Sequence, residues 1–136
     1  MMLSDFVQVL PVRSRRGPQD AEVRSATGDS RQVRPGSLFA AIPGTRVDGH
    51  RFIRQANLAG ARVVLLRDWP TDEEWPSDVV GLQVDDPRRA MALVAHALEG
   101  QPSRALKVFG ITGTNGKTTT VGILGSILEA AGLASG

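Results

Sequence analysis

The chain has 136 residues, an ordinary length for one domain and enough to bury a hydrophobic core. Hydrophobic residues make up 41% and charged residues 22%, and the net charge of +2 comes without a basic block, which argues against a nucleic-acid-binding protein. The absence of cysteine excludes disulfides and thiolate metal sites. No apolar run approaches the roughly 18 residues of a membrane-spanning helix, and residues 1–10 lack the basic leader of a signal peptide, so we expect a cytoplasmic protein.

Apolar spacing and turn residues predict short helices and strands in the first half of the chain. Residues 11–20 are polar and include two prolines, so we expect a loop there. Gly60 would end the helix that follows Asp48. In chain order, the expected elements are an amphipathic helix at 3–10, a loop at 11–20, strands at 22–26 and 37–42, and a helix at 50–58.

The alternation continues in the second half, with strands expected at 62–66 and 79–84. The acidic segment between them contains two Trp-Pro pairs, and we expect Trp69 and Trp75 to pack locally against the loop prolines rather than to stack on a base. Asp86 suits a helix N-cap and Pro87 a first helical position, which predicts a helix that begins there and ends before Gly100.

This order of elements predicts an α/β fold: a small mixed sheet flanked by helices, followed by a truncated P-loop unit of strand, loop and helix. The turn at 100–103 is the best candidate for a boundary between two domains. We therefore expect two domains, at 1–103 and 104–136.

The segment 110–120 is the most informative stretch of the chain. It follows an apolar segment at 105–109, for which we expect a strand, and leads into a helix-periodic segment at 121–131. A glycine-rich turn between strand and helix binds nucleotide phosphates, because glycines let backbone N–H groups face the anion. Lys117 would reach the β- and γ-phosphates, and the hydroxyl of Thr118 would bind Mg²⁺.

The spacing of this loop departs from the common phosphate-loop pattern. Ile111 stands where the first glycine is expected, and Gly113 lies four residues before Lys117. A glycine-rich turn with an incidental lysine is the alternative interpretation. The run resembles the ATP-binding loop of the Mur ligases, the amide-forming enzymes of peptidoglycan precursor synthesis, at Gly113-Thr114-Asn115-Gly116-Lys117-Thr118-Thr119.

Short sequence runs upstream of this loop narrow the resemblance to one type of Mur ligase. The resemblance extends over residues 22–133, approximately. These runs resemble the UDP-binding N-terminal domain of the MurE type, the tripeptide synthetases that add the third residue of the stem peptide. The MurF type, which adds D-Ala-D-Ala, shares the first two runs and stays an alternative. The runs are Asp-Ser-Arg at 29–31, Pro-Gly-Ser-Leu-Phe at 35–39, Ala-Ile-Pro-Gly-Thr-Arg-Val-Asp-Gly at 41–49, Phe-Ile at 52–53 and Gln-Ala at 55–56.

The resemblance implies two binding sites and assigns no catalytic residue with certainty. From the residues alone, the favoured interpretation of 29–31 is a plain turn with a solvated arginine. The implied UDP-substrate residues are Gly28, Ser30, Thr45, Arg46 and Val47. The implied ATP-binding residues are Gly113, Thr114, Asn115, Gly116, Lys117, Thr118 and Thr119, with Thr118 also binding Mg²⁺ through the nucleotide.

The resemblance also implies a reaction, in which a substrate carboxylate becomes an acyl phosphate at the expense of ATP and an incoming amine displaces phosphate. The implied partner is UDP-N-acetylmuramoyl-dipeptide, and the complete enzyme would use ATP and Mg²⁺. Three domains make a complete ligase, so we expect no ligase activity from this chain alone. A stand-alone UDP-sugar-binding module and an unrelated P-loop NTPase are the alternative functions.

Overall fold

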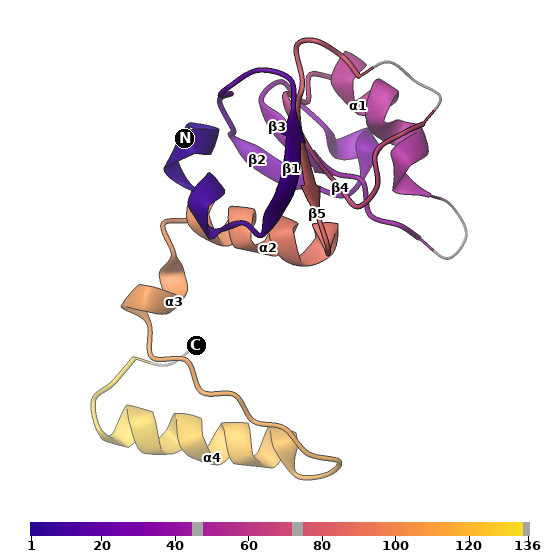
Figure 1. Ribbon diagram of the computed structural model, residues 1–136. Helices are drawn as coiled ribbons and strands as arrows, with labels where there is room; N and C mark the ends of the chain where they lie inside the picture. The colour runs from indigo at the N-terminus through magenta and orange to yellow at the C-terminus, as the bar shows by residue number, and fades with distance from the viewer. Residues whose placement is uncertain (45–47, 72–74, 135–136) are drawn as a thin grey trace. The chain divides into compact units, whose positions relative to one another are not determined.

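The computed structural model describes residues 1–44, 48–71 and 75–134. The chain forms two compact units, Met1–Pro102 and Ser103–Gly136 (Figure 1). The assignment of 1–103 and 104–136 to two domains of one family stays a prediction, because compactness alone does not identify a domain. In the described part of the chain, no helix combines the length and the apolar character that crossing a membrane requires.

The first unit is built on a mixed sheet with the strand order β1-β5-β4-β3-β2. The strands from β2 to β5 are parallel to one another, and β1 joins the edge of β5 in the antiparallel direction. This sheet confirms the predicted α/β class. The strands are β1 (Val12–Arg16), β2 (Ser25–Thr27), β3 (Ser37–Ala40), β4 (Val63–Leu66) and β5 (Val80–Val84).

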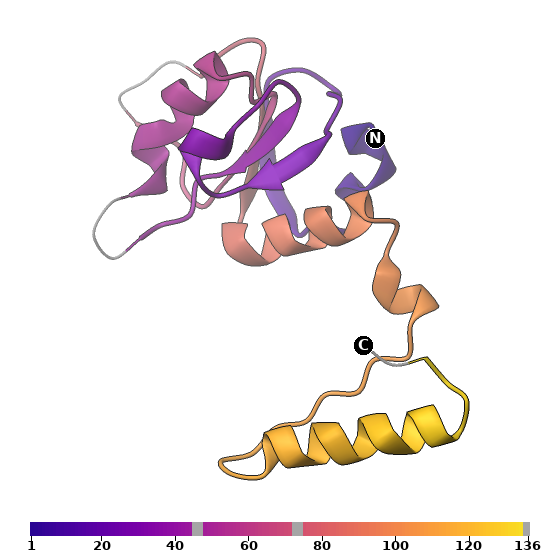
Figure 2. The same ribbon diagram turned by 180° about the vertical axis from the view of Figure 1, so that it is seen from behind.

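Helices and turns cover both faces of this sheet. The longest helix of the unit, α2, packs with the N-terminal turns over one face, and Figure 2 shows it beneath the strands from behind. The shorter helix α1 packs over the other face with the turns that precede it. The elements are η1 (Leu3–Asp5), η2 (Val7–Val9), η3 (Ser30–Gln32), η4 (Gly49–Phe52), α1 (Ile53–Leu58) and α2 (Pro87–Leu98).

Each central strand contributes side chains to both cores. In β4, Val63 and Leu65 pack in the core under α2, whereas Val64 and Leu66 pack in the core under α1. All four side chains are fully buried. A parallel strand that is covered on both faces has no solvent-facing side, which explains its continuous apolar sequence.

The start of α2 agrees with the sequence. Asp86 accepts a hydrogen bond at its carboxylate from the backbone N–H of Arg89 at 3.0 Å, and Pro87 occupies the first turn. This N-cap pairs one of the helical amides that would otherwise lack a partner. It places the residues before α2 at the same edge of the sheet as the ends of the parallel strands.

A glycine in β5 makes room for two tryptophans. Trp69 and Trp75 pack edge to face, with ring centroids 5.1 Å apart. A Cβ at Gly81 would lie 2.5 Å from Cζ2 of Trp75 and 2.7 Å from Cζ3 of Trp69, which is closer than any real contact. The guanidinium of Arg16 lies 4.3 Å from the Trp69 ring centroid. The tryptophans thus pack locally, against each other and over Gly81, and their expected packing against the loop prolines stays a prediction.

Three sequence expectations differ from the structure. The predicted loop at 11–20 contains β1, an edge strand whose exposed polar side chains give no apolar alternation. The helix expected at 3–10 is two 3₁₀ turns, although Leu3, Phe6 and Leu10 are buried as expected. The strand expected at 105–109 is absent from the described residues, where the short helix α3 (Pro102–Ala105) precedes irregular chain. A strand requires a hydrogen-bonded neighbour, which no described residue supplies there.

The second unit has little buried apolar surface of its own. Its helix α4 (Lys117–Ala130) begins four residues earlier than the helix-periodic segment at 121–131. Val121, Ile123 and Ile127 are each more than half exposed, and so is Phe109 before the loop. Hydrophobic burial therefore contributes little to the stability of this unit.

We predict that Gly81→Val destabilises the first unit by about 1–3 kcal/mol, because the new side chain must displace the tryptophan pair. The unfolding temperature followed by tryptophan fluorescence measures this loss directly, since both tryptophans lie in this unit. Gly122→Ala is the matched control, because a Cβ at Gly122 meets no atom within 4 Å. An unchanged unfolding temperature and emission maximum in Gly81→Val would contradict the prediction.

We also predict that amide hydrogens exchange faster in 105–136 than in 37–66. An isolated helix shorter than about 12–15 residues is marginally stable in water, and α4 has 14 residues without a buried side chain among those described. The amides of β3 and β4 belong to a sheet whose residues are buried. Hydrogen exchange followed by mass spectrometry measures both segments in one sample. Equal protection of the two segments would contradict the prediction and would show that contacts with other residues stabilise α4.

Candidate functional site

The carboxyl ends of the parallel strands bring the predicted substrate residues to one edge of the sheet. Residue Gly28 follows β2, Ile42 follows β3, Arg67 follows β4 and Asp85 follows β5. In open α/β sheets, ligands bind outside the carboxyl ends of the strands, where loops are free to differ while the strands stay buried. This edge is therefore the candidate substrate site of the first unit.

Gly28 and Ser30 lie at the same strand end but contact different covering layers. A Cβ at Gly28 would lie 3.0 Å from Cδ1 of Ile42 and 3.8 Å from Sδ of Met91, which belongs to α2. The hydroxyl of Ser30 instead donates to Oε1 of Gln55 in α1, at 3.4 Å. That hydrogen bond is long and exposed, so a ligand group could replace it at little cost. Gln55 belongs to one of the runs that carry the resemblance, but the sequence did not indicate it as a candidate site residue.

The turn at 29–31 is held together by its own ion pair. The carboxylate of Asp29 accepts hydrogen bonds from the side chain of Arg31 at 2.7–3.2 Å and from its backbone N–H at 3.0 Å. The Arg31 side chain first, and then its N–H, lowers the pKa of Asp29 from 3.8 to about 2. Arg31 is thus engaged within the turn, and Ser30 is the member that faces another element.

The predicted residues Thr45, Arg46 and Val47 lie outside the described residues. The two ends of their segment are defined, because Pro43 and Asp48 form an isolated antiparallel bridge. Gly49 follows the bridge and is buried, with its N–H donating to the carbonyl of Ile42 at 3.2 Å. A Cβ at Gly49 would lie 2.6 Å from that carbonyl oxygen, so the close approach requires glycine.

Asp48 and His50 form a pair at the end of this segment that the sequence did not reveal. One carboxylate oxygen of Asp48 accepts the N–H of His50 at 3.0 Å and lies 2.6 Å from its Nδ1. These contacts, led by the backbone N–H, hold the pKa of Asp48 below its ordinary value of 3.8. The Nε2 atom of His50 is buried without a partner in the described chain. The signal in the sequence that could have indicated this pair is an aspartate two residues before a histidine.

A hollow of about 280 Å³ opens at the same edge, and we refer to it as the edge hollow. It lies where the segment after β3 approaches the start of α2, so it adjoins the predicted substrate segment. Its lining residues are Ile42, Pro43, Arg67, Asp85, Asp86, Pro87 and Arg88.

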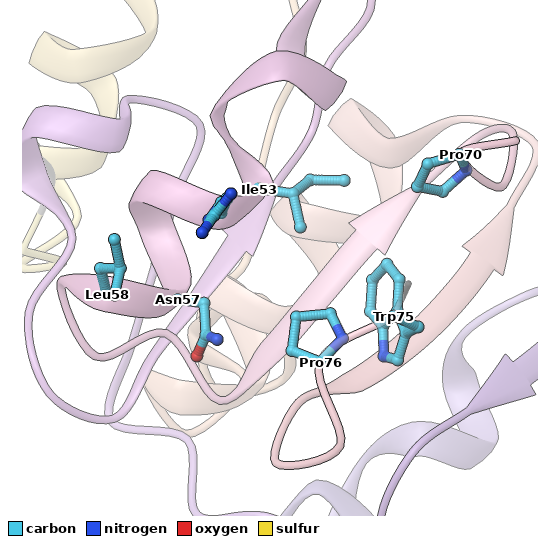
Figure 3. Close-up of a pocket in the computed structure, with 7 residues that line it drawn as sticks. Ile53, Asn57, Leu58, Pro70, Trp75 and Pro76 are labelled. Carbon is cyan, nitrogen blue, oxygen red and sulfur yellow. The ribbon is translucent and has the colours of Figure 1, made fainter. Parts of the chain in front are cut away.

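A larger hollow of about 420 Å³, the side hollow, lies between α1 and the segment that carries the tryptophans. Figure 3 shows Ile53 of α1 pointing toward Pro70 and Trp75, with Pro76 beside them. The indole N–H of Trp75 donates to the carbonyl of Val79 at 2.7 Å, which fixes the ring in this wall. None of the predicted site residues lines the side hollow within the described chain.

The glycine-rich loop of the second unit has the backbone that a phosphate loop requires. Gly113 and Gly116 have positive φ angles of 152° and 76°, which side chains rarely tolerate. Gly116 is also the N-cap of α4. Lys117 folds back over the loop, with Nζ donating to the carbonyls of Gly113 at 2.5 Å and Thr114 at 3.1 Å. The loop therefore curls around the lysine ammonium.

The residues of this loop fit a magnesium nucleotide. The amides of Lys117, Thr118 and Thr119 have no hydrogen-bond partner among the described residues, so they can donate to phosphate oxygens at the start of α4. The hydroxyl of Thr120 bonds the carbonyl of Gly116 at 2.9 Å, whereas that of Thr118 has no partner in the described chain. Thr118 is therefore available as a Mg²⁺ ligand.

An α/β sheet with loops at its carboxyl edge, followed by a phosphate-type loop, is an arrangement that is typical of nucleotide-binding proteins. Sequence comparison identifies the family. The chain belongs to the Mur ligase family: it matches the family described as "Mur ligase family, catalytic domain" over residues 22–98, more than half of its length. The resemblance that the sequence motifs indicated is confirmed.

Curated relatives match the whole chain. It is 45% identical to the UDP-N-acetylmuramyl-tripeptide synthetase of Deinococcus radiodurans, and 41% identical to the UDP-N-acetylmuramoyl-L-alanyl-D-glutamate–2,6-diaminopimelate ligase of Chlorobium phaeobacteroides. Each alignment includes 100% of this chain but 27–28% of the relative, so the chain spans about a quarter of the length of these relatives.

Solved structures show the same fold at lower identity. A crystal structure of MurF from Acinetobacter baumannii has a TM-score of 0.57 at 34% identity, covering 83% of this chain and 23% of that one. MurF from Thermotoga maritima in complex with ADP has a TM-score of 0.53 at 28% identity, covering 79% and 24%.

We predict that the carboxyl group of Asp29 titrates near pH 2 and that Arg31→Gln moves its pKa back toward 3.8. A pKa that is lower in the folded than in the unfolded chain stabilises the fold above about pH 4, and this contribution is lost as the pH falls toward 2. NMR of the carboxyl carbon measures the titration. Arg34→Gln is the control and should leave it unchanged. Identical titrations in wild type and Arg31→Gln would contradict the assigned cause.

Proposed function

We propose that this chain supplies the UDP-substrate-binding part, and the beginning of the ATP-binding part, of a cytoplasmic ligase. That ligase would add the third amino acid to UDP-N-acetylmuramoyl-L-alanyl-D-glutamate in peptidoglycan precursor synthesis. The observation that carries the proposal is the 45% identity, over the whole chain, to a relative named as a tripeptide synthetase. The edge position of Gly28 and Ser30 supports it, because both follow a parallel strand at the end where ligands bind.

In this proposal, the first unit binds the UDP substrate and the second unit binds the nucleotide triphosphate. Ser30 and the segment at 45–47 would hold the nucleotide end of the UDP substrate, far from its reacting carboxylate. Binding energy from such a remote group serves to orient the reacting end. Within the first unit, Gln55 would set the Ser30 hydroxyl until the ligand replaces it.

The second unit would hold the nucleotide triphosphate. When bound, Mg-ATP supplies the phosphoryl group that activates the substrate carboxylate. Lys117 would neutralise the β- and γ-phosphates from its place over the loop, Thr118 would bind the Mg²⁺ ion, and the three free amides at the start of α4 would receive phosphate oxygens.

The MurF type is a second candidate, because solved MurF structures share the fold at 28–34% identity. The identities of 41–45% to MurE-type relatives favour the first candidate. A UDP-sugar-binding module without catalysis would use the same edge of the sheet and would not need Lys117. Titration with Mg-ATP separates the module from the ligase: binding that Lys117→Gln weakens and Lys107→Gln leaves intact favours the ligase.

We predict that Ser30→Ala weakens binding of UDP-N-acetylmuramoyl-dipeptide by about 5- to 10-fold, which is the effect of one lost hydrogen bond. Isothermal titration calorimetry of the full chain measures the affinity. Ser126→Ala is the matched control, because Ser126 bonds the carbonyl of Gly122 within α4 and touches no predicted substrate residue in the described chain.

Two outcomes would count against the proposed function. If wild type and Ser30→Ala bind UDP-N-acetylmuramoyl-dipeptide with the same affinity, the substrate does not bind at Ser30 on the edge of the sheet. Binding of Mg-ATP with no binding of any uridine nucleotide would instead favour an unrelated P-loop NTPase.

A further inference from the structure

The edge hollow is lined by two carboxylates that already have partners and by two arginines that have none in the described chain. Asp85 is paired with Arg13 of β1 at 2.5 Å, and Asp86 caps α2 through the N–H of Arg89. Both acids are therefore engaged by groups outside the lining of the hollow. Their partners hold these carboxylates in place, which leaves the two arginines of the lining as the groups that are available to bind a ligand.

Arg67 and Arg88 are these two arginines. Both are exposed, and neither guanidinium has a hydrogen bond or an ion pair within 1–44, 48–71 and 75–134. Arg67 follows β4 and Arg88 lies in the first turn of α2, so they approach the hollow from different elements. Two unpaired guanidinium groups on one concave surface attract an anion and can each present a bidentate fork of donors.

The edge hollow is continuous with the predicted substrate residues. Ile42 lines the hollow, and its Cδ1 lies 3.0 Å from the position that a Cβ of Gly28 would occupy. One side chain thus separates Gly28 from the hollow. Neighbouring strands lie about 4.8 Å apart, so the end of β4 is about 10 Å from the end of β2, two strands away. An extended nucleoside diphosphate can span that distance.

We propose that Arg67 and Arg88 bind the diphosphate of the nucleotide-sugar substrate in the edge hollow, with the nucleoside at Gly28 and Ser30. This inference rests on the proposed function and adds the part of the substrate that the hollow recognises. A volume of about 280 Å³ suits a charged portion of a ligand, since sites that enclose a whole small molecule measure about 300–1,000 Å³. The two arginines are positioning residues, because they act on a group remote from the reacting carboxylate.

The test compares uridine with UDP by isothermal titration calorimetry of the full chain. UDP should bind at least about tenfold more tightly than uridine, because charge-assisted hydrogen bonds to phosphate are strong. Arg67→Gln and Arg88→Gln should each weaken UDP binding about 3- to 10-fold and leave uridine binding unchanged. The double variant should bind UDP no better than uridine. Raising the salt concentration should weaken UDP binding by the wild type and leave UDP binding by the double variant nearly unchanged.

Arg89→Gln is the matched control. Arg89 is the next residue in α2, is also exposed, and does not line the edge hollow. An unfolding temperature measured for each variant checks that the fold is retained, as expected for exposed arginines. The control should leave the affinities for both ligands as they are in the wild type.

The inference fails, and the proposed function stands, if the double variant keeps the full advantage of UDP over uridine. It also fails if Arg89→Gln weakens UDP binding as much as Arg88→Gln does. The proposed function fails first if neither uridine, UDP nor UDP-N-acetylmuramoyl-dipeptide binds the chain, and the inference then falls with it.

Discussion

Burial of both faces of the parallel sheet is the constraint on which the first unit depends. β3 and β4 are buried along their whole length, with alternate side chains in the cores under α1 and α2. A sheet that is covered on both faces has no surface for polar chemistry. Polar side chains that could contact a ligand must then follow the strands, as Ser30 does after β2 and Arg67 does after β4.

The same constraint explains which parts of the fold could be predicted. The apolar runs that form β3 and β4 and the capped start of α2 are local signals, and the structure confirms them. β1 escaped prediction because an exposed edge strand needs no apolar alternation and is defined by its pairing with β5, some 70 residues away in sequence. Such pairing cannot be read from a single short segment.

The candidate site also contains features that the sequence could indicate and features that it could not. The resemblance to a family motif indicated Ser30, and the spacing of glycines, lysine and threonine in the loop indicated Lys117. The contact of Gln55 with Ser30 could not be predicted, because it joins residues 25 positions apart. The edge hollow could not be predicted either, because it forms where segments after three different strands meet. Sequence patterns thus identify residues within one loop, whereas the shape of a site depends on the sheet that gathers several loops.

The two units differ in what determines their structure. The first has two cores, and its loops are held by contacts such as the Asp29–Arg31 pair and the close approach of Gly49 to Ile42. The phosphate-type loop of the second unit is held by local geometry, the positive φ angles of Gly113 and Gly116 and the folded-back Lys117. A loop that depends on local geometry can form its binding conformation without an extensive core around it. The exposed apolar side chains of α4 are therefore not needed to explain the conformation of the loop.

The central claim is that the first unit binds the nucleotide of its substrate at the carboxyl edge of the sheet. The most direct measurement is a titration of the ¹⁵N-labelled chain with UDP, followed by two-dimensional NMR. The account predicts that the amide signals of Gly28, Ser30 and Arg67 shift with UDP concentration, while those around the side hollow at Asn57 and Trp75 stay in place. Shifts confined to the side hollow, or a spectrum that UDP leaves unchanged, would contradict it.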